Sequence, residues 1–369
     1  MKTKKIGVLT SGGDCAGLNP AIKSVVMAAT DDRIQRDEGV KFEVLGIRDG
    51  WKGLLNAEAS GPKFEQNIWP LDQESVMTWD RFGGTFLGTS RTNPFDPKND
   101  RSKIAVDNVL KLGLDVLVAI GGDDTIGAAI KLSQLGVNVV GIPKTIDKDL
   151  PETDYSLGFE TALNVIVEET DRLRTTASSH HRVFVIEIMG RTAGWLALEG
   201  GEAAGADMIL IPECDFSMDR VNQLVMEKSR SGAKYQMIAA SEGAKPTGGI
   251  EIYKGEAIDS FGHKILGGLG DWLASEITKG TKLETRCVVL SHLQRGGIPC
   301  AYDRRMGRYF GIAAVGLILK EDFGKMVCFR NGRIGSVPFE KVMGRLSLVD
   351  VKTQYDAERY NGRRTITGI

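Results

Sequence analysis

Short apolar runs alternate with longer segments of helical periodicity along the whole chain. In the first part, the apolar runs predict strands at 6–10, 42–47, 116–120 and 137–142, and helical spacing predicts helices at 19–30, 101–112 and 125–135. After position 158, strands are predicted at 183–189, 208–211, 235–240, 286–290 and 326–329, and helices at 159–176, 193–205, 218–230, 266–279 and 304–320. This alternation predicts an α/β protein whose sheets are mainly parallel and flanked by helices, with ligands at the carboxyl ends of the strands.

We expect these elements to form two Rossmann-like lobes, because a chain of 369 residues is too long for a single hydrophobic core. We expect one lobe to comprise residues 1–158 and about 294–340. The other is expected to comprise residues 159–293 and a tail of about 341–369. Two such lobes leave a cleft between them, which suits an enzyme with two substrates. The Arg- and Lys-rich tail carries no motif that indicates a function.

Charge and cysteine content narrow the class of protein. Lys and Arg number 47 against 48 Asp and Glu, for a net charge of -1, whereas a nucleic-acid-binding surface needs a basic excess. The five cysteines show no metal-ligand spacing, so neither a disulfide framework nor a zinc site is predicted. The first residues lack a signal-peptide pattern, and no apolar run nears the roughly 18 residues of a membrane span. We therefore expect a soluble, cytoplasmic protein with no nucleic-acid or membrane partner.

Three predicted strands of the first lobe end in loops rich in glycine, aspartate and threonine. These loops lie at 10–14, 121–125 and 143–149 and read TSGGD, GGDDT and PKTIDKD. Glycines let amide groups approach phosphate oxygens, and the N-terminus of a following helix adds partial positive charge. Aspartates at the same edge suit Mg²⁺, which prefers oxygen ligands. A single loop of this kind is equally well explained as a tight turn, but three at consecutive strand ends predict a phosphate and metal site.

The third of these loops carries two carboxylates, Asp147 and Asp149, two positions apart. A carboxylate beside a sugar hydroxyl accepts its proton during phosphoryl transfer. The alternative interpretation is that both aspartates brace the turn. Lys144 and Lys148 flank them and are able either to bind phosphate or to pair with the aspartates. Neither GxxxxGK[ST] nor GxGxxG follows the first strand, so Walker-type ATP hydrolysis and ordinary dinucleotide binding are disfavoured.

The second lobe places basic side chains near the ends of its predicted strands. A guanidinium group grips two phosphate oxygens at once, so several of them together predict a cradle for a sugar phosphate. Any one of these side chains alone is as well explained as a member of a surface ion pair. The residues concerned are Arg182, Arg191, Arg286, His292 and Arg295.

Taken in order, the motifs of the chain resemble those of the phosphofructokinase family. They are SGGDxxGxN at 11–19, GGTFLGTSR at 83–91, GGDDT at 121–125, PKTIDKD at 143–149, SSHHR at 178–182, MGR at 189–191, SEG at 241–243, and ETR and HLQRGG within 284–297. The match extends from Lys5 to about Glu321. The resemblance implies the fold of that family, with the active site in the cleft between the two lobes. It also implies that the lobe of residues 1–158 and about 294–340 binds the phosphoryl donor and metal, and that the lobe of residues 159–293 and about 341–369 binds the sugar phosphate.

The resemblance also implies roles for individual residues. Asp147 would be the general base that takes the proton from the sugar 1-hydroxyl, with Thr145 and Arg191 as further catalytic residues. Asp123 would hold Mg²⁺. The implied donor-binding residues are Gly13, Arg91, Asp124 and Lys144. The implied contacts to the sugar phosphate are Thr145, Asp147, Asp149, Arg182, Met189, Gly190, Arg191, Glu242, Arg286, His292 and Arg295.

Three of these residues bear on assembly. Arg182 and Arg286, with His292, match the positions that clamp the sugar 6-phosphate, and in the family both arginines come from the neighbouring subunit. The resemblance therefore implies a homodimer or homotetramer whose sites are shared between subunits.

Two positions bear on the phosphoryl donor. ATP-using members of the family usually have glycine at the position of Asp124, whereas diphosphate-using members resemble this chain at both Asp124 and Lys144. A carboxylate there would repel the α-phosphate of a nucleotide, and an ammonium group would neutralise the leaving phosphate. We therefore expect a reversible, Mg²⁺-dependent transfer from diphosphate to fructose 6-phosphate, a step of glycolysis and gluconeogenesis. ATP as the donor is the main alternative.

One departure from the family pattern bears on the acceptor. The family usually has asparagine where this chain has Lys148, which adds a positive charge between two carboxylates. This charge would alter metal affinity or attract a differently placed phosphate. Sedoheptulose 7-phosphate or an unphosphorylated polyol is therefore an alternative acceptor, although the arginine clamp favours a phosphorylated one. A non-catalytic regulatory subunit is a further alternative, against which Asp123 and Asp147 both argue.

Overall fold

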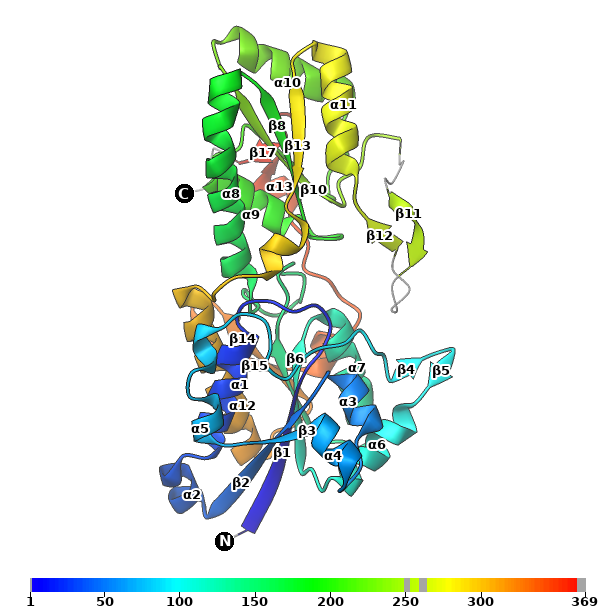
Figure 1. Ribbon diagram of the computed structural model, residues 1–369, viewed down its shortest axis with the longest axis vertical. Helices are drawn as coiled ribbons and strands as arrows, with labels where there is room; N and C mark the ends of the chain where they lie inside the picture. Colours follow the sequence, from blue (N-terminus) through cyan, green and yellow to red (C-terminus); the bar gives the residue numbers. More distant parts are fainter. Residues whose placement is uncertain (1, 249–252, 259–263, 364–369) are drawn as a thin grey trace. The chain divides into compact units, whose positions relative to one another are not determined.

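The computed structural model describes residues 2–248, 253–258 and 264–363, which form two compact units (Figure 1). Unit 1 comprises Met1–Ile146, Leu150–Thr161 and Arg295–Leu346, and unit 2 comprises Asp147–Asp149, Ala162–Gln294 and Ser347–Ile369. The predicted assignment of the donor to one lobe and of the sugar phosphate to the other stays a prediction.

Unit 1 is built around a seven-stranded sheet in the order β15-β14-β7-β6-β1-β2-β3. Its strands are β1 (Lys2–Thr10), β2 (Val40–Ile47), β3 (Ile68–Leu71), β6 (Val116–Gly121), β7 (Val139–Pro143), β14 (Lys325–Arg330) and β15 (Arg333–Pro338). The pairs β2–β3 and β14–β15 are antiparallel, and all other neighbours are parallel. Every residue of β6 and β7 is buried, as expected for central parallel strands covered by helices on both faces.

The helices of unit 1 lie on both sides of this sheet (Figure 1). They are α1 (Leu18–Ala29), α2 (Asp32–Glu38), α3 (Trp51–Asn56), α4 (Pro62–Asn67), α5 (Gln73–Val76), α6 (Ser102–Lys111), α7 (Asp123–Gln134) and α12 (Ala301–Leu319). Shorter elements are the 3₁₀ turns Trp79–Arg81 and Phe339–Lys341 and the small hairpin β4 (Phe95–Asp96) and β5 (Asn99–Asp100).

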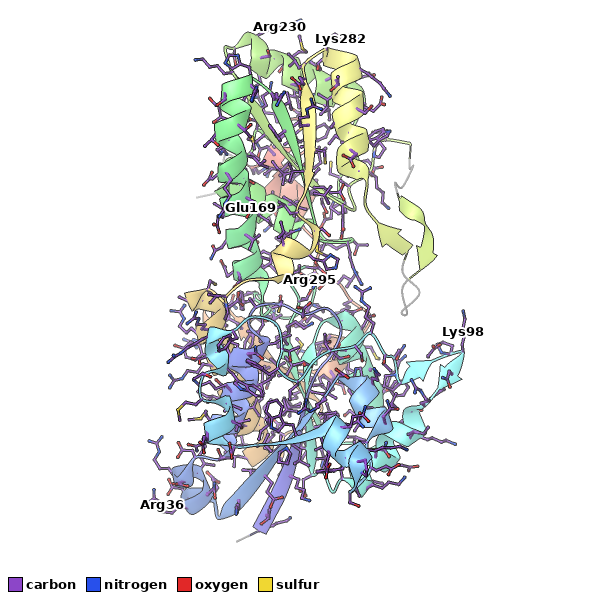
Figure 2. The ribbon with its side chains drawn as sticks, in the orientation of Figure 1. Arg36, Lys98, Glu169, Arg230, Lys282 and Arg295 are labelled. Atoms are coloured by element: carbon purple, nitrogen blue, oxygen red, sulfur yellow. The ribbon has the colours of Figure 1, made fainter. Side chains whose placement is uncertain are left out.

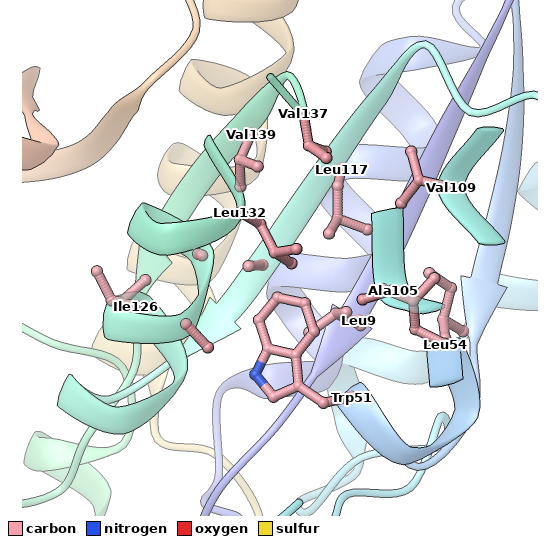
Figure 3. Packing of buried hydrophobic residues seen from close by; sticks show 14 of the residues in the cluster. Leu9, Trp51, Leu54, Ala105, Val109, Leu117, Ile126, Leu132, Val137 and Val139 are labelled. Atoms are coloured by element: carbon pink, nitrogen blue, oxygen red, sulfur yellow. The ribbon is translucent and has the colours of Figure 1, made fainter. Parts of the chain in front are cut away.

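The core on one face of the sheet is formed by α3, α6 and α7 (Figure 3). Its apolar side chains come from the helices and from alternate positions of the strands, because successive strand residues point to opposite faces. Among them are Leu9, Trp51, Leu54, Ala105, Val109, Leu117, Ile126, Leu132, Val137 and Val139.

Helices α1 and α12 pack closely against each other. At Gly307 an added Cβ would lie 2.8 Å from the Pro20 side chain, and at Gly311 it would lie 2.6 Å from Ser24 Cβ. These two glycines, one helical turn apart, therefore permit the close approach of the two helices.

Unit 2 contains a four-stranded parallel sheet in the order β13-β8-β10-β9. Its strands are β8 (Val183–Ile188), β9 (Met208–Leu210), β10 (Gln236–Ser241) and β13 (Thr285–Val289), and its helices are α8 (Phe159–His180, which begins in unit 1), α9 (Trp195–Ala203), α10 (Met218–Arg230) and α11 (Leu269–Thr281). Further elements are β11 (Tyr253–Ile258), β12 (Lys264–Leu266), the 3₁₀ turn Ser291–Arg295, α13 (Val351–Gln354), β16 (Tyr355–Asp356) and β17 (Asn361–Gly362).

The tail of the chain covers the β9 edge of this sheet. Ile209 N donates to Tyr360 O at 2.6 Å, and the Tyr355 hydroxyl donates to Ile209 O at 2.6 Å. Both tyrosines are buried. The described part of the tail from Ser347 to Arg363, in which the sequence shows no functional motif, is thus packed into unit 2.

The predicted α/β class, with mainly parallel sheets flanked by helices, is confirmed by this topology. Two helix starts were predicted too late: α7 begins at Asp123 instead of 125, and α12 begins at Ala301 instead of 304. In α12 the Cys300 thiol accepts a hydrogen bond from Asp303 N and so caps the helix before the predicted start. The edge strands β3 and β15 were not predicted, because β3 is short and contains Pro70 and β15 lacks a continuous buried run.

Within the described residues, no helix has both the length and the apolar content of a transmembrane span.

Candidate active site

The three strand-end loops of unit 1 lie together because β1, β6 and β7 are adjacent in the sheet. Ser11 N donates to Ile120 O at 3.2 Å, which joins the first loop to the end of β6. Lys144 N donates to Gly121 O at 3.0 Å, which joins the third loop to the second. The convergence predicted from the sequence therefore exists in unit 1, at the carboxyl edge of its sheet.

Lys144 places a cation inside this group of loops. Its side chain is only 3% exposed, and its ammonium donates to Ser11 O at 3.3 Å and to Gly13 O. A buried ammonium surrounded by carbonyls and glycine loops is suited to attract an anion to the same place.

Gly13 is packed directly under the Arg295 guanidinium (labelled in Figure 2). A Cβ at Gly13 would lie 2.6 Å from Arg295 Nη1, and the same nitrogen donates to Asp14 O at 3.1 Å. Arg295, which the family resemblance assigns to the sugar phosphate, thus contacts the first donor loop. The sequence analysis did not anticipate this contact, because 281 positions separate Asp14 from Arg295.

The segment that leads to Arg91 is fastened to the first loop by hydrogen bonds. Thr10 Oγ1 donates to Gly88 O at 2.8 Å, Thr89 Oγ1 donates to Gly12 O at 2.6 Å, and Gly12 N donates to Ser90 O at 3.0 Å. Arg91, which follows directly, is exposed.

Asn19 supports the same segment from α1. Its amide nitrogen donates to Phe82 O at 3.0 Å and Gly83 O at 3.1 Å, and its oxygen accepts from Phe86 N at 2.9 Å. The asparagine of the first motif is therefore the residue that holds the second motif in place, a role that the sequence analysis missed although the residue is part of the motif.

Asp123 and Asp124 form the first turn of α7 instead of a loop. Two carboxylates there are stabilised by the partial positive charge of the helix N-terminus. Gly121, just before them, has no room for a side chain, since a Cβ would lie 2.2 Å from Thr125 Cβ. Among the described residues, no group of three or more His, Cys, Asp or Glu side chains is placed to hold a metal ion.

Asp147 and Thr145, which the family resemblance assigns to catalysis, are both nearly inaccessible to solvent. Asp147 is 6% exposed and Thr145 is 8% exposed. The Ser156 hydroxyl donates a hydrogen bond to Thr145 O at 2.7 Å. Between the two aspartates, Lys148 adopts the left-handed backbone conformation, with φ of 55°, in which asparagine is much commoner than lysine.

Glu242 lies beside Arg191 and Asp147 in unit 2. Glu242 Oε1 accepts from Arg191 N at 3.3 Å, and burial together with the charge of Asp147 raises the pKa of Glu242 to about 7. Arg191 also has a positive φ of 51°, and a Cβ at Gly243 would lie 1.8 Å from Arg191 O. The segment Met189–Gly190–Arg191 is therefore held closely against the Glu242 turn.

The two predicted phosphate-clamping arginines lie together and share one carboxylate. Glu284 Oε1 is 2.9 Å from Arg182 Nη2 and 2.6 Å from Arg286 Nη2. The hydrogen bonds from both guanidinium groups lower the pKa of Glu284. The sequence analysis names Glu284 in the ETR motif but gives it no role. The signal for this contact is the pair of opposite charges, Glu284 and Arg286, two positions apart at the start of β13.

His292 lies on the 3₁₀ turn Ser291–Arg295, where its Nδ1 is 3.0 Å from Ser291 Oγ. Within the part of the chain that the structure describes, no hydrogen bond joins it to Arg182 or Arg286. The structure thus brings the two arginines together but does not add His292 to them.

Comparison with known proteins decides the family. The family model described as Phosphofructokinase matches residues 5–318. The chain belongs to the phosphofructokinase family. The predicted family and the phosphotransferase class are therefore confirmed.

Relatives within the phosphofructokinase family carry the names of two activities. A protein of Dictyoglomus thermophilum named pyrophosphate–fructose 6-phosphate 1-phosphotransferase is 47% identical, over 95% of this chain and 96% of its own length. A protein of Chloroflexus aurantiacus named ATP-dependent 6-phosphofructokinase is 42% identical, over 94% of this chain and 93% of its own length.

A solved structure agrees with the fold. The pyrophosphate-dependent phosphofructokinase of Marinobacter aquaeolei matches with a TM-score of 0.81, covering 98% of this chain and 89% of that one. At 23% identity this likeness supports the phosphofructokinase fold alone.

Proposed function

We propose that this enzyme reversibly transfers a phosphoryl group from diphosphate to the 1-hydroxyl of fructose 6-phosphate, giving fructose 1,6-bisphosphate and phosphate. The observation that carries the proposal is the buried ammonium of Lys144, bound to the Gly13 loop, in a chain 47% identical to a relative named for this activity. The prediction of a diphosphate donor depended on this lysine together with Asp124.

The donor end of the site supports diphosphate over a nucleotide. Lys144 supplies a fixed positive charge for the leaving phosphate, and the amide groups of the Gly13 loop supply hydrogen-bond donors. Asp124, in the first turn of α7, adds a negative charge where the α-phosphate of ATP would have to lie. Arg91 completes the set of donor-binding residues.

Mg²⁺ is the proposed cofactor, held by Asp123. An exposed carboxylate in the first turn of α7, next to the strand-end loops, fits an ion that prefers oxygen ligands and also binds phosphate oxygens. When bound, the ion supplies charge neutralisation for the diphosphate.

Asp147 is the proposed general base. Its carboxylate takes the proton of the sugar 1-hydroxyl as that oxygen forms a bond to the distal phosphorus of diphosphate. The bond between this phosphorus and the bridging oxygen breaks, and phosphate leaves with the electron pair. Thr145 and Arg191 assist at the transferred group, and burial of Asp147 and Thr145 keeps both side chains in a fixed orientation.

The sugar phosphate is proposed to contact residues of both kinds, hydrogen-bonding and cationic. The sugar is bound by Glu242, Met189, Gly190, Asp149 and Arg295. The 6-phosphate is bound by Arg182, Arg286 and His292.

We also propose a homo-oligomer, either a dimer or a tetramer, because the family resemblance implies that the two arginines come from a neighbouring subunit. Its mass in solution, measured by sedimentation, tests this assembly.

The cytoplasm is the proposed location. None of the five cysteines, all of which lie in the described residues, forms a disulfide, which fits a reducing compartment.

ATP-dependent phosphorylation of fructose 6-phosphate is the second candidate, favoured by the 42% identical relative named for it. A coupled assay with purified protein, Mg²⁺ and fructose 6-phosphate separates the two by comparing diphosphate with ATP. Turnover with diphosphate alone supports the proposal, and turnover with ATP alone overturns the donor assignment. No turnover with either donor would direct the search to other sugars and polyols, and to Lys148.

The variant Asp124→Gly extends this assay. Removing the carboxylate is expected to raise the ratio of ATP to diphosphate turnover by about tenfold, the effect of one like-charge contact near the surface. An unchanged ratio would refute the argument from repulsion.

A further inference from the structure

Within unit 2, the turn that carries Asp147 and Asp149 is held against α9 by a side chain with no role in the proposed chemistry. Lys148 Nζ lies 2.6 Å from Glu199 Oε1 and 5.0 Å from the centroid of the Trp195 ring. Trp195 and Glu199 are four positions apart on α9 and therefore share one face of that helix. The side chain of Lys148 thus spans one turn of α9.

The tail fastens the same turn from a second direction. Ser347 N donates to Asp149 O at 2.8 Å, and Trp195 Nε1 donates to Ser347 O at 3.0 Å. These contacts close a ring that runs from Asp149 through Ser347 and Trp195 to Lys148. The aspartate turn is therefore held by both a side chain and its backbone.

The segment after Ser347 is itself anchored. Val349 N and Gly194 N both donate to Glu213 Oε1, each at 2.9 Å. Gly194 precedes α9, so this carboxylate ties the tail to the start of the helix that holds Lys148.

The backbone of the turn needs this support. Lys148 has a φ of 55°, a conformation that residues other than glycine adopt rarely and keep only where the surrounding structure determines it. Asparagine, which is usual in the family at this position, enters that conformation more readily. Lysine enters this conformation less readily than asparagine, but its longer side chain reaches Glu199.

We propose that Glu199 is a positioning residue that acts through Lys148 on the orientation of Asp147. The ion pair with Lys148 and the contact of Lys148 with Trp195 fix the turn, and the fixed turn holds the Asp147 carboxylate where it meets the sugar hydroxyl. This inference rests on the proposed role of Asp147 as general base. A base displaced by about 1 Å loses up to a hundredfold in rate, so a partly exposed ion pair remote from the reacting atoms affects turnover.

The variant Glu199→Gln tests this role. We expect kcat to fall about tenfold, as for a slightly misplaced catalytic group, with KM for both substrates changed by no more than about twofold. The melting temperature should change by no more than about 2 °C, since the pair is partly exposed. The matched control is Glu276→Gln, because Glu276 is also 32% exposed and pairs with Lys279 at 2.7 Å, away from the aspartate turn. All three quantities should be unchanged in the control.

A double-mutant cycle separates the pair from independent effects. Lys148→Met should lower kcat about tenfold, and the double variant with Glu199→Gln should also lose about tenfold instead of a hundredfold. Lys148→Arg keeps the charge and the ring contact and should retain kcat within about threefold. Additive losses, or an unchanged kcat in either Glu199→Gln or Lys148→Met, would overturn the proposal.

Amide hydrogen exchange provides a readout that does not depend on activity. Exchange in the peptide that spans 146–150 should be about fivefold faster in Glu199→Gln than in the wild type and unchanged in Glu276→Gln. If the wild type proves inactive with every donor and acceptor, the proposed function fails, and this measurement alone decides whether Glu199 orders the turn. Unchanged exchange in Glu199→Gln would overturn the proposal in either case.

Discussion

The donor loops of unit 1 and the arginine pair of unit 2 are built in opposite ways. In the donor loops, backbone hydrogen bonds, buried hydroxyls and glycines without room for a Cβ leave few alternative conformations. Arg286 is 59% exposed, and Arg182 and Arg286 are held by one carboxylate, Glu284, that is itself 47% exposed. One region is a preformed cradle, and the other is a pair of side chains that is free to exchange a partner.

Under the proposed function, this difference predicts where each region acts. A preformed cradle would stabilise charge that develops during the reaction without reorganising, which raises kcat. An exposed arginine pair would contribute mainly to binding, because the substrate phosphate would have to replace Glu284. We therefore expect changes in buried groups to lower kcat and changes in the exposed pair to raise KM.

The largest expected effect comes from Asp147, a buried carboxylate that is 6% exposed. Asp147→Ser should lower kcat by about 10²–10⁴, the usual loss for a general base, while the affinity for fructose 6-phosphate changes little. Steady-state kinetics and calorimetric titration measure the two quantities. Normal turnover would remove Asp147 from the role of base.

The second-largest effect is expected when alanine replaces a glycine of the donor loops. The comparison is between Gly121, at the end of β6, and Gly127, six positions later in α7. Gly121→Ala should destabilise the protein by about 2 kcal/mol or more, because its Cβ would overlap with the buried Thr125 side chain. Gly127→Ala is the control, since nothing lies within 4 Å of its Cβ, and it should be neutral or stabilising by up to about 1 kcal/mol. Denaturant unfolding measures both, and equal stabilities would show that the cradle is adaptable.

A smaller effect is expected at the exposed pair. Arg286→Ala should raise KM for fructose 6-phosphate by about 10–100-fold, the loss of one charge-assisted contact, and leave kcat within about threefold. Arg172→Ala, which breaks another exposed pair with Glu168 at 2.6 Å, should leave both constants unchanged. A drop in kcat without a change in KM would reverse the comparison.

The smallest effect is a dependence of stability on pH. The pKa of Glu242 is raised to about 7 from its ordinary value of 4.5, because burial and the charge of Asp147 favour the protonated form. Between these two values the folded state binds a proton that the unfolded state does not, so this group's contribution to the unfolding free energy rises as pH falls through 7. When the pH is lowered from 8 to 6, the unfolding free energy of the wild type should increase by about 1 kcal/mol relative to that of Glu242→Gln. Parallel stability curves for the two proteins would contradict the assignment.

The strength of sequence reasoning differs between the same two regions. The donor loops were predicted from glycines and aspartates at the ends of buried strands, and the adjacency of β1, β6 and β7 brings them together as expected. The arginines near the strand ends predicted a cradle for a sugar phosphate, but the role of each arginine depended on the family resemblance, since exposed cations have no periodic pattern. The shared carboxylate Glu284 and the separate position of His292 appear only in the structure.

The sequence by itself determined the α/β class, the order of most strands and helices, and the family, because buried strands, amphipathic helices and turn glycines are read over a few neighbouring residues. Only the tertiary structure decided which distant side chains meet. Lys148 reaches Glu199 across 51 positions, and Arg295 covers Gly13 and bonds Asp14 across 281. Such contacts follow from packing, whose energy depends on the complete arrangement of the elements and leaves no pattern in any local stretch of sequence.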